Sequence, residues 1–212
     1  MSNVLPKAVL FDLLTALIDS WTLWNATAGS EEAGRRWRAE YLRLTYGCGD
    51  YRPYETLVRE AARATGLAEA AADALEARWC ELPVWSGAQE ALDALQGRTR
   101  LAVVTNCSVR LGELAAARLK IRWDCVITAE EAGAYKPDPR PYRRALDRLG
   151  VAPQDAAFVA GSGYDLFGTS VVGLRTYWHN RIGLARPDAA PGASLERPTL
   201  DDLIPWLEGR LP

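Results

Sequence analysis

The sequence is poor in the residues that bind transition metals or form disulfides. Its 212 residues include one histidine and four cysteines, and no pair of cysteines has the C-x-x-C spacing of a zinc or redox site. Cys48, Cys80, Cys107 and Cys125 are therefore predicted to be reduced thiols, which is typical of a cytoplasmic protein. The pattern gives no reason to expect a metal or another cofactor.

Long apolar runs and an excess of either charge are also missing. No apolar run reaches the length that spans a membrane, and the N-terminus lacks the basic segment and apolar stretch of a signal peptide. The formal net charge is −2, which gives no reason to expect nucleic acid or an anionic membrane as a partner. We therefore expect a cytoplasmic protein with no nucleic-acid or membrane partner.

The first apolar segment delivers a single carboxylate. Residues 8–11 are all apolar and are followed by Asp12, which is typical of a strand buried on both faces of a parallel sheet. In open α/β sheets, ligands bind at the carboxyl ends of the strands. Asp12 is thus either a residue of a binding site or a simple turn former, because Asp is common in turns.

The rest of the chain divides into a helical block and an alternating region. Residues 20–82 have helical spacing and contain no convincing strand, whereas strand and helix patterns alternate from about residue 86 onward. Alternation of this kind predicts an α/β fold with a Rossmann-like, doubly wound parallel sheet. We expect a core domain of residues 1–18 and 90–212, with a helical cap subdomain of residues 19–89 inserted above the strand ends.

Individual elements can be placed from apolar spacing and capping signals. Ser86 and Gln89 have the form of a capping box that opens a helix, Thr199 is expected to cap the final helix, and residues 183–198 read as a loop. The further predicted strands are 101–105, 126–128, 156–160 and 174–178, and the further predicted helices are 108–119, 141–149 and 164–172.

Polar side chains follow the ends of several predicted strands. Thr105 and Asn106 end the second strand, Lys136 lies after the third, and Ser162 and Asp165 follow the fourth. If the sheet is parallel, these groups and Asp12 share one pocket. Each also has a structural alternative, because Asn and Ser form turns, Lys136 could be a solvated charge, and Asp is favoured at helix N-termini.

In order and spacing, these segments resemble the four motifs of the haloacid dehalogenase superfamily. The resemblance covers essentially the whole chain, with a helical insertion after the first motif. The four segments are Phe11-Asp12-Leu-Leu-Thr-Ala-Leu, Val103-Val-Thr105-Asn106, Tyr135-Lys136-Pro-Asp138 and Phe158-Val-Ala-Gly-Ser162-Gly-Tyr-Asp165. The resemblance implies a Rossmann-like core with a cap and a hydrolase whose nucleophile is Asp12.

Most members of this superfamily are magnesium-dependent phosphatases with a D-x-D first motif and a metal-binding acid in the fourth. In this sequence Leu14 occupies the second position of D-x-D, and Gly161 stands where the metal-binding acid is expected. A hard cation needs several oxygen ligands, and Asp12 and Asp165 alone would be a poor set. We therefore expect no metal and do not favour a phosphatase.

The branch without the second aspartate is the L-2-haloacid dehalogenases, and further residues are similar to that family. Trp37-Arg38 resembles a cap pair whose arginine binds halide, Asn106 its asparagine partner, and Tyr142 the family tyrosine. The neighbours Arg35, Arg36 and Arg43 leave a solvated helix face as the alternative for Arg38. Relatives in this family are often dimers, so a homodimer is possible.

The resemblance implies a reaction in two steps. Asp12 displaces halide from C2 of a short 2-halo acid, and water then hydrolyses the resulting ester to a 2-hydroxy acid. The catalytic residues implied are Asp12, Arg38, Asn106, Lys136, Ser162 and Asp165. The substrate-binding residues implied are Leu13, Leu14, Arg38, Thr105, Asn106 and Tyr142.

The sequence departs from the family at three places. The family has glycine then threonine after the nucleophile where this chain has Thr15 then Ala16, so that hydroxyl is expected to be displaced or lost. Ala160 and Ser162 replace serine and asparagine, which affects the hydrogen bonds of the hydrolytic water. These changes keep open a non-catalytic protein that binds a small anion or a protein.

Overall fold

All strands of the core run parallel in one sheet. The computed structural model describes residues 4–211, and in it six strands lie in the order β3-β2-β1-β4-β5-β6. The strands are β1 Ala8–Phe11, β2 Arg100–Thr105, β3 Cys125–Thr128, β4 Ala156–Ala160, β5 Arg175–His179 and β6 Leu195–Arg197. The strand order reverses at the centre, between β1 and β4, which is the point where α/β sheets bind ligands. The predicted fold class is confirmed.

The central strand is buried on both sides, as its apolar run predicts. Val9 and Phe11 belong to one hydrophobic cluster and Ala8 and Leu10 to another, and all four side chains are 0% exposed. Successive side chains of a strand point to opposite faces, so the two clusters are the two faces of the sheet. A polar residue in this strand is tolerated only at its end, where Asp12 lies.

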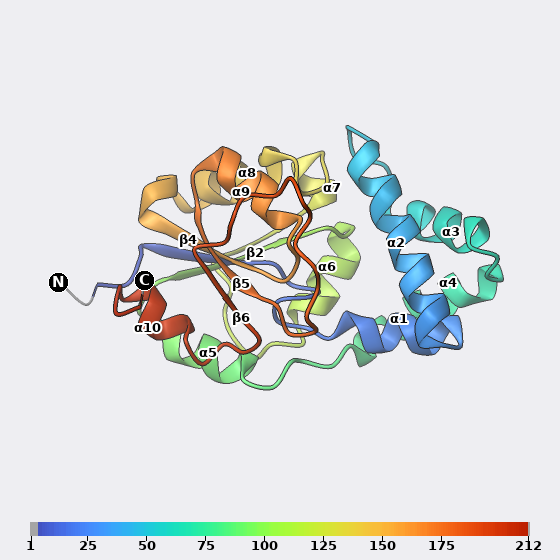
Figure 1. The fold of residues 1–212 in the computed structure, drawn as a ribbon, viewed down its shortest axis with the longest axis horizontal. Coiled ribbons are helices and arrows are strands. Elements are labelled where there is room, and N and C mark those ends of the chain that lie inside the picture. The colour runs from blue at the N-terminus through green and yellow to red at the C-terminus, as the bar shows by residue number, and fades with distance from the viewer. Residues whose placement is uncertain (1–3, 212) are drawn as a thin grey trace.

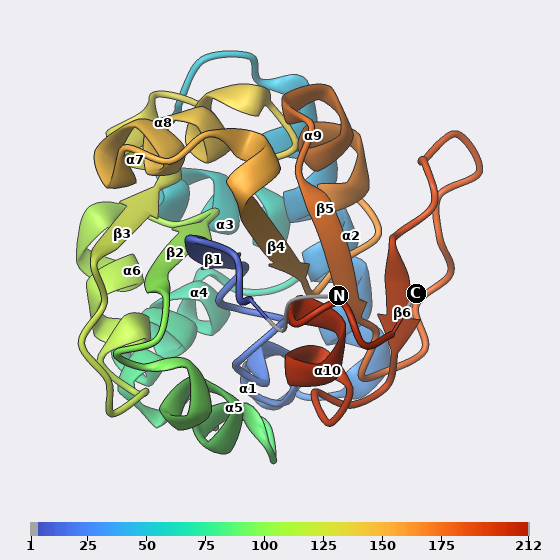
Figure 2. The same cartoon turned by 90° about the vertical axis from the view of Figure 1, so that its left-hand side faces the viewer.

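Helices of the core cover both faces of the sheet (Figure 2). Helices α8 and α9 pack on one face, and α5, α6 and α10 contribute to the cluster on the other. The core helices are α5 Ala88–Leu95, α6 Val109–Ala116, α7 Ala129–Ala132, α8 Pro139–Leu149, α9 Asp165–Val172 and α10 Leu203–Leu207, with the short 3-10 turn η2 Pro153–Asp155. None of the helices in the described part is long and apolar enough to cross a membrane.

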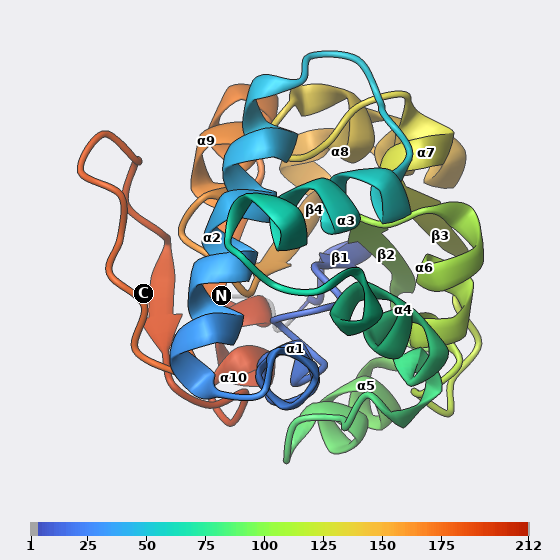
Figure 3. The same cartoon turned by 90° about the vertical axis from the view of Figure 1, so that its right-hand side faces the viewer.

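The predicted helical block forms a group of helices at the carboxyl ends of the strands (Figures 1 and 3). These are α1 Ser20–Ala28, α2 Glu31–Gly47, α3 Tyr54–Ala64 and α4 Glu69–Ala77, followed by the 3-10 turn η1 Trp79–Glu81. Aromatic rings hold the block together: Trp24 lies 4.6 Å from Trp37 and 5.5 Å from Tyr41, between ring centroids. Such contacts pack the long helix α2 against α1.

The two chain crossings between this block and the core lie side by side. Ile18 and Val84 form an antiparallel bridge, and the Trp85 N–H donates to the Leu17 carbonyl at 2.9 Å. Helix α5 packs its Leu92 into the main cluster, which includes the sheet. The division into core and cap stays a prediction, and the paired crossings favour a second boundary near Val84 rather than at residue 89.

Two predicted helix caps are wrong. Helix α5 begins after Gly87, which has φ 84° and makes no side-chain cap, so Ser86 and Gln89 do not form a capping box. The last helix begins after Asp202, and the Thr199 hydroxyl donates to Asp201 instead. Both segments contain several residues with capping chemistry, and backbone conformation decides which of them is used.

Two short elements were not predicted. Strand β6 lies inside residues 183–198, which the sequence predicts to be a loop, and its three residues pair in parallel with β5. Its side chains are exposed or half-buried, so it has no apolar pattern to reveal it. Helix α7 has only four residues and is equally invisible to periodicity.

Candidate active site

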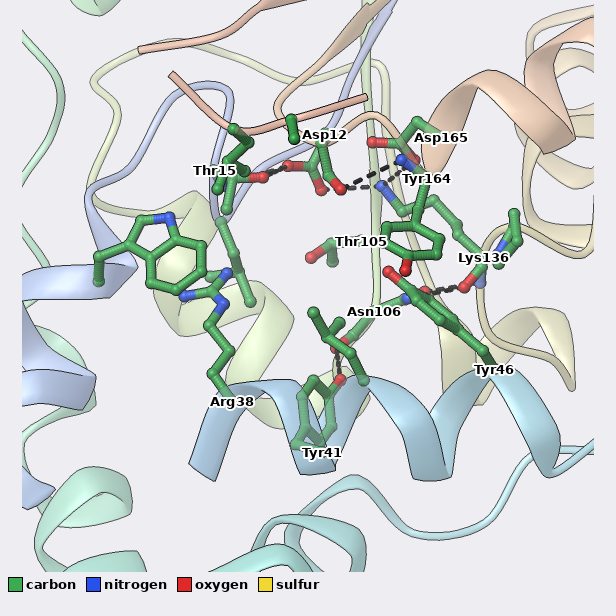
Figure 4. Close-up of a pocket in the computed structure, with 17 residues that line it drawn as sticks. Asp12, Thr15, Arg38, Tyr41, Tyr46, Thr105, Asn106, Lys136, Tyr164 and Asp165 are labelled. Atoms are coloured by element: carbon green, nitrogen blue, oxygen red, sulfur yellow. Dashed lines mark hydrogen bonds and ion pairs between the residues drawn. The ribbon is translucent and has the colours of Figure 1, made fainter. Parts of the chain in front are cut away.

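Asp12 extends from the end of β1 into a network of hydrogen bonds (Figure 4). Its Oδ2 accepts from the Thr15 N–H at 3.1 Å, the Thr15 hydroxyl at 2.5 Å and the Ala16 N–H at 3.2 Å. Its Oδ1 accepts from Lys136 Nζ at 2.8 Å. The two oxygens are thus unequal: Oδ2 is held by three donors of the following turn, whereas among residues 4–211 Oδ1 accepts only from the ammonium group.

Lys136 joins Asp12 to the second carboxylate. Its Nζ lies 2.9 Å from Asp165 Oδ1, and the same oxygen accepts from the Tyr142 hydroxyl at 2.8 Å. All three ionic side chains are less than 10% exposed. Charges buried this deeply persist only when they are paired, so the three groups form one unit.

Burial and pairing act in opposite directions on these groups. Burial alone would raise the pKa of Asp12, but Lys136 and the bonds from Thr15 hold it below its usual value. Burial would lower the pKa of Lys136, and the two carboxylates raise it. Burial dominates at Asp165, with Asp12 adding to it, and the pKa of that carboxyl is raised despite Lys136. Asp12 is therefore the stronger acid of the two.

Arg38 comes from helix α2 and approaches Asp12 from the opposite side (Figure 4). The side chain is 7% exposed, its Nη1 donates to the Ser20 hydroxyl at 2.7 Å, and its guanidinium lies 4.0 Å from the centroid of the Trp21 ring. Among residues 4–211 it has no carboxylate partner. Burial lowers the pKa of Arg38, and Tyr54, Tyr41 and Asp12 oppose the change. A buried cation without an anion is a ready anion site.

Thr105 and Asn106, the predicted site residues at the end of β2, have different surroundings and roles. The Asn106 amide donates to the Lys136 carbonyl at 3.0 Å, and its oxygen accepts from the Lys136 N–H at 2.7 Å. Asn106 therefore fixes the backbone that carries Lys136, with one amide hydrogen left over. Thr105 is fully buried next to Cys107. Burial raises the pKa of Cys107 to about 12, so this thiol is not a nucleophile.

Most of the predicted site residues share one cavity of about 180 Å³. The predicted residues that line it are Asp12, Leu14, Arg38, Thr105, Asn106, Lys136, Ser162 and Asp165. Leu13 and Tyr142 do not line it: both are 0% exposed, and Tyr142 reaches the site only through Asp165. The Ser162 hydroxyl accepts from the Tyr164 N–H at 3.2 Å.

Sequence reasoning missed the aromatic wall of this cavity. Trp21, Tyr41, Tyr46 and Tyr164 line it, and the rings of Tyr46 and Tyr164 lie 4.6 Å apart, one from the cap and one from the core. The Tyr41 hydroxyl donates to the Asn106 carbonyl at 3.1 Å. Tyrosines at positions 41 and 46 in one helix lie about one and a half turns apart, which gives no recognisable signal.

The threonine hydroxyl, expected to be displaced or lost, is displaced by one position and keeps its contact with Asp12. Thr15 stands one position earlier than in the resembled family, yet its hydroxyl contacts Asp12 at 2.5 Å. The turn reaches this position because Gly161 lets it approach closely: a Cβ at Gly161 would lie 2.2 Å from the Thr15 hydroxyl oxygen and 2.3 Å from the Ala16 nitrogen. The turn thus fills the space beside Gly161.

A magnesium ion does not fit this donor set. No side chain has room at Gly161, Leu14 offers no oxygen, and Lys136 already lies between the two carboxylates. Within the described ranges, no group of three or more histidine, cysteine or carboxylate side chains could hold a metal ion.

The fold and the site agree with comparisons to known proteins. Residues 6–167 match the model of the hydrolase family described as haloacid dehalogenase-like hydrolase. The chain is 30% identical over 193 residues to (S)-2-haloacid dehalogenase 1 of a Pseudomonas species, which covers 83% of this chain and 85% of that protein. The chain therefore belongs to the haloacid dehalogenase-like hydrolases.

Other relatives match over shorter lengths. (S)-2-haloacid dehalogenase 4A of Burkholderia cepacia is 33% identical over 114 residues, 52% of this chain and 49% of that protein. The phosphoserine phosphatase of Thermus thermophilus is 35% identical over 146 residues, 65% of this chain and 59% of the phosphatase. The chain thus spans about half to three fifths of these two relatives.

Solved structures agree with the fold over the whole chain. The structure of a dehalogenase with an intermediate complex has a TM-score of 0.84 and 27% identity, and it covers 98% of this chain and 99% of its own. The family includes both dehalogenases and phosphatases, so the activity has to be argued from the site.

Proposed function

We propose that this protein is a metal-independent 2-haloacid dehalogenase with Asp12 as its nucleophile. The observation that carries the proposal is one cavity holding an ionised, hydrogen-bonded carboxylate opposite a buried arginine that has no carboxylate partner in the part of the chain that the structure describes. A carboxylate can attack a carbon and form an ester. A desolvated guanidinium can stabilise the halide that leaves.

The unequal oxygens of Asp12 support one direction of attack. Oδ2 accepts three hydrogen bonds from the turn, which withdraw electron density and hold that oxygen away from the substrate. Oδ1 contacts only Lys136, and we assign it as the attacking atom. The C2–halogen bond breaks as the new C2–O bond forms, and the halide leaves with the bonding electrons toward Arg38 and Trp21.

The substrate carboxylate needs donors beside the nucleophile. Within the described chain, the N–H groups of Leu13 and Leu14 have no hydrogen-bond acceptor, although they follow Asp12 directly. We propose that they bind the carboxylate together with the Thr105 hydroxyl, so that Leu13 acts through its backbone. The hydrogen bonds of Asn106 fit two roles: its amide supports the Lys136 backbone and offers its remaining amide hydrogen to the halide.

Hydrolysis of the ester then needs a positioned water. The raised pKa of Asp165 makes its carboxylate the better base of the two, and Ser162 lines the same cavity. Water would attack the carbonyl carbon of the Asp12 ester and pass a proton to Asp165. The bond between that carbon and the oxygen attached to C2 then breaks, and the departing oxygen takes the proton back from Asp165 to leave as a 2-hydroxy acid. Lys136 and Tyr142 orient Asp165 for this step.

A phosphatase is the alternative from the same family. The D-x-D carboxylate that would protonate its leaving group is replaced by Leu14 at the cavity wall, and the donor set does not fit magnesium. A non-catalytic anion-binding protein would also use Arg38, but it would not need a second buried carboxylate held by Lys136.

Halide and phosphate release separate these functions. The purified protein is incubated without metal with each enantiomer of 2-chloropropionate, and separately with a phosphatase substrate with and without Mg²⁺. We expect chloride release without metal, abolished in Asp12→Asn. Phosphate release only with Mg²⁺ would refute the dehalogenase, and no turnover of either substrate would favour the binding protein.

A further inference from the structure

The turn behind the nucleophile is anchored by side chains that the reaction itself does not use. Three consecutive carbonyls of this turn each accept a hydrogen bond from a different part of the chain. The Ser20 hydroxyl donates to the Leu14 carbonyl at 2.5 Å and Trp85 Nε1 to the Thr15 carbonyl at 3.0 Å. His179 Nδ1 lies 2.7 Å from the Ala16 carbonyl.

The geometry of the peptide bond connects these anchors to Asp12. In a trans peptide group the C=O of one residue and the N–H of the next lie in one plane and point in opposite directions. The Leu14 carbonyl shares its plane with the Thr15 N–H, and the Thr15 carbonyl shares its plane with the Ala16 N–H. These are the two N–H groups that donate to Asp12 Oδ2. Each donor is therefore held at its far end by Ser20 or Trp85.

The third anchor closes the turn. A carbonyl can only accept a hydrogen bond, so the proton of neutral His179 lies on Nδ1. The peptide group that His179 holds ends in the Leu17 N–H, which donates to the Leu13 carbonyl at 3.2 Å. His179 comes from β5, Ser20 from the cap helix α1, and Trp85 from the returning crossing, so the turn is fixed from three directions.

Ser20 also links the turn to the cap. Its hydroxyl accepts from Arg38 Nη1 at 2.7 Å while it donates to Leu14, and the residue is 0% exposed. The hydroxyl proton points to the Leu14 carbonyl, and a lone pair of the same oxygen accepts from Arg38, so Ser20 makes both bonds at once. The arginine assigned to the halide and the turn assigned to the nucleophile are thus one hydrogen-bonded chain.

We infer that Ser20, Trp85 and His179 are positioning residues that hold the two N–H donors on Asp12 Oδ2 and so leave Oδ1 as the attacking oxygen. This inference rests on the proposed function for its catalytic meaning. The hydrogen bonds to Asp12 themselves exist whatever the substrate is, and they can be tested without turnover.

The substrate-free test follows the Asp12 carboxyl by ¹³C NMR as pH is lowered, with Asp12→Asn to identify its signal. Trp85→Phe removes one anchoring N–H and keeps an aromatic ring. We expect the titration midpoint of the Asp12 carboxyl to rise by about half a pH unit to one pH unit, since hydrogen bonds to a carboxylate favour its charged form.

Trp79→Phe is the matched control, because Trp79 also donates its Nε1–H to a backbone carbonyl, that of Leu111 at 2.9 Å, and lies away from the cavity. The charged groups facing Asp12, namely Lys136, Asp165 and Arg38, are unchanged in both variants.

Rescue by similar side chains distinguishes positioning from general packing. His179→Leu removes the donor, whereas His179→Asn places an amide N–H near the former Nδ1, and Ser20→Thr keeps the hydroxyl that Ser20→Ala lacks. We expect His179→Leu and Ser20→Ala to raise the titration midpoint of Asp12 and to speed the amide-proton exchange of Thr15 and Ala16 at neutral pH. His179→Asn and Ser20→Thr should bring the titration midpoint and the exchange rate back toward those of the unchanged protein.

Activity gives the second readout. In Trp85→Phe and His179→Leu, which leave the Ser20–Arg38 hydrogen bond in place, we expect kcat to fall about tenfold with KM within about twofold, because these two anchors contact no group assigned to substrate binding. Unchanged exchange, midpoint and kcat in folded Trp85→Phe and His179→Leu would overturn the inference, as would an equal effect of Trp79→Phe. If no halide is released at all, the proposed function fails, and the titration and exchange still decide the positioning role.

Discussion

Lys136 places one ammonium group between two buried carboxylates, 2.8 Å from Asp12 and 2.9 Å from Asp165. Buried ion pairs of this kind contribute little to stability, because desolvation offsets their attraction. Their value here is to keep Asp12 ionised in a site from which water is largely excluded. With Arg38 added, the four charges of the cavity sum to zero before a substrate anion enters.

Replacing Lys136 by Met should reveal this role in the pH profile. Asp12 has a pKa below its usual 3.8 in the folded protein, so its carboxylate stays ionised to lower pH than an ordinary aspartate. Without Lys136 burial dominates and the pKa rises, so the acidic limb of kcat/KM should move to higher pH and the rate should fall roughly 100-fold or more. A limb that stays in place would contradict the assignment. The measurement is kcat/KM for 2-chloropropionate across the acidic range.

Tyr142→Phe should affect only the second step. The Tyr142 bond to Asp165 lowers the pKa of that carboxyl, so its loss raises the pKa further. We expect the acidic limb of kcat to move to higher pH, with the first-turnover burst of halide unchanged. Tyr177→Phe is the matched control, because Tyr177 is a buried tyrosine whose hydroxyl donates to the Thr199 carbonyl. A reduced burst in Tyr142→Phe would place this residue in the first step instead.

At the level of elements, the cavity is closed where helix α2 meets the start of α9. Tyr46 from α2 and Tyr164 from the loop before α9 contact each other and both line the cavity. The Tyr164 side chain is 41% exposed, so the pair lies at the boundary between the cavity and the solvent. The two rings therefore limit the length of a substrate that extends toward solvent.

Tyr46→Ala should widen the range of substrates. Removing this ring takes away one side of the contact, and we expect kcat/KM for 2-chlorohexanoate to rise relative to 2-chloropropionate by about tenfold, the scale of discrimination by a few apolar contacts. Tyr51→Ala is the control, because Tyr51 also stacks from the cap on a core tyrosine, Tyr135, at 5.3 Å. If both variants change the ratio equally, the effect belongs to cap mobility and not to the Tyr46 ring.

Elements with a strong apolar pattern or a defined place in the sheet could be predicted from the sequence. Strand β1 and the polar groups after β1, β2 and β4 follow from the parallel arrangement, since all such ends meet at one edge. Strand β6 could not be predicted because an exposed three-residue edge strand leaves no pattern. The Ser86 cap failed because Gly87 adopts positive φ, which sequence chemistry alone does not reveal.

From strand and helix patterns, the candidate site was predictable only at the strand ends, and Arg38 of helix α2 was expected only through the family resemblance. Thr15, Trp85 and His179 act on Asp12 or its turn through hydrogen bonds between segments up to 163 residues apart in the chain. Such partners depend on how the close approach at Gly161 bends the turn and on where the chain returns from the helical block to the core, next to Trp85. Tyr46 and Trp21 likewise became site residues only because the cap docks at the strand ends.

The whole molecule is organised around a hydrophobic cluster that does not stop at the edge of the core. One cluster contains Phe11 of the sheet, Leu92 of α5, and Leu57 and Trp37 of the cap helices. A continuous cluster favours unfolding of all its elements together. The cap is therefore expected to be part of the cooperative unit, although it forms a separate layer in Figure 1.

Leu57→Ala in the cap and Leu92→Ala in the core should have similar consequences. Both side chains are 0% exposed, so each substitution should lower the free energy of unfolding by about 2–5 kcal/mol. We expect urea unfolding followed by far-UV circular dichroism and by tryptophan fluorescence to coincide in both variants. A separate early transition in Leu57→Ala alone would show that the cap unfolds independently.

The covalent role of Asp12 can be measured directly in heavy-oxygen water. With enzyme in excess over 2-chloropropionate, a single turnover in H₂¹⁸O should place one heavy oxygen in the Asp12 carboxylate, because water attacks the carbonyl carbon of the ester. Mass analysis of the peptide that contains Asp12 should show this label, and the 2-hydroxy acid from that turnover should contain none. Label in the product and none in Asp12 would mean that water attacks the substrate itself, which would contradict nucleophilic catalysis by Asp12.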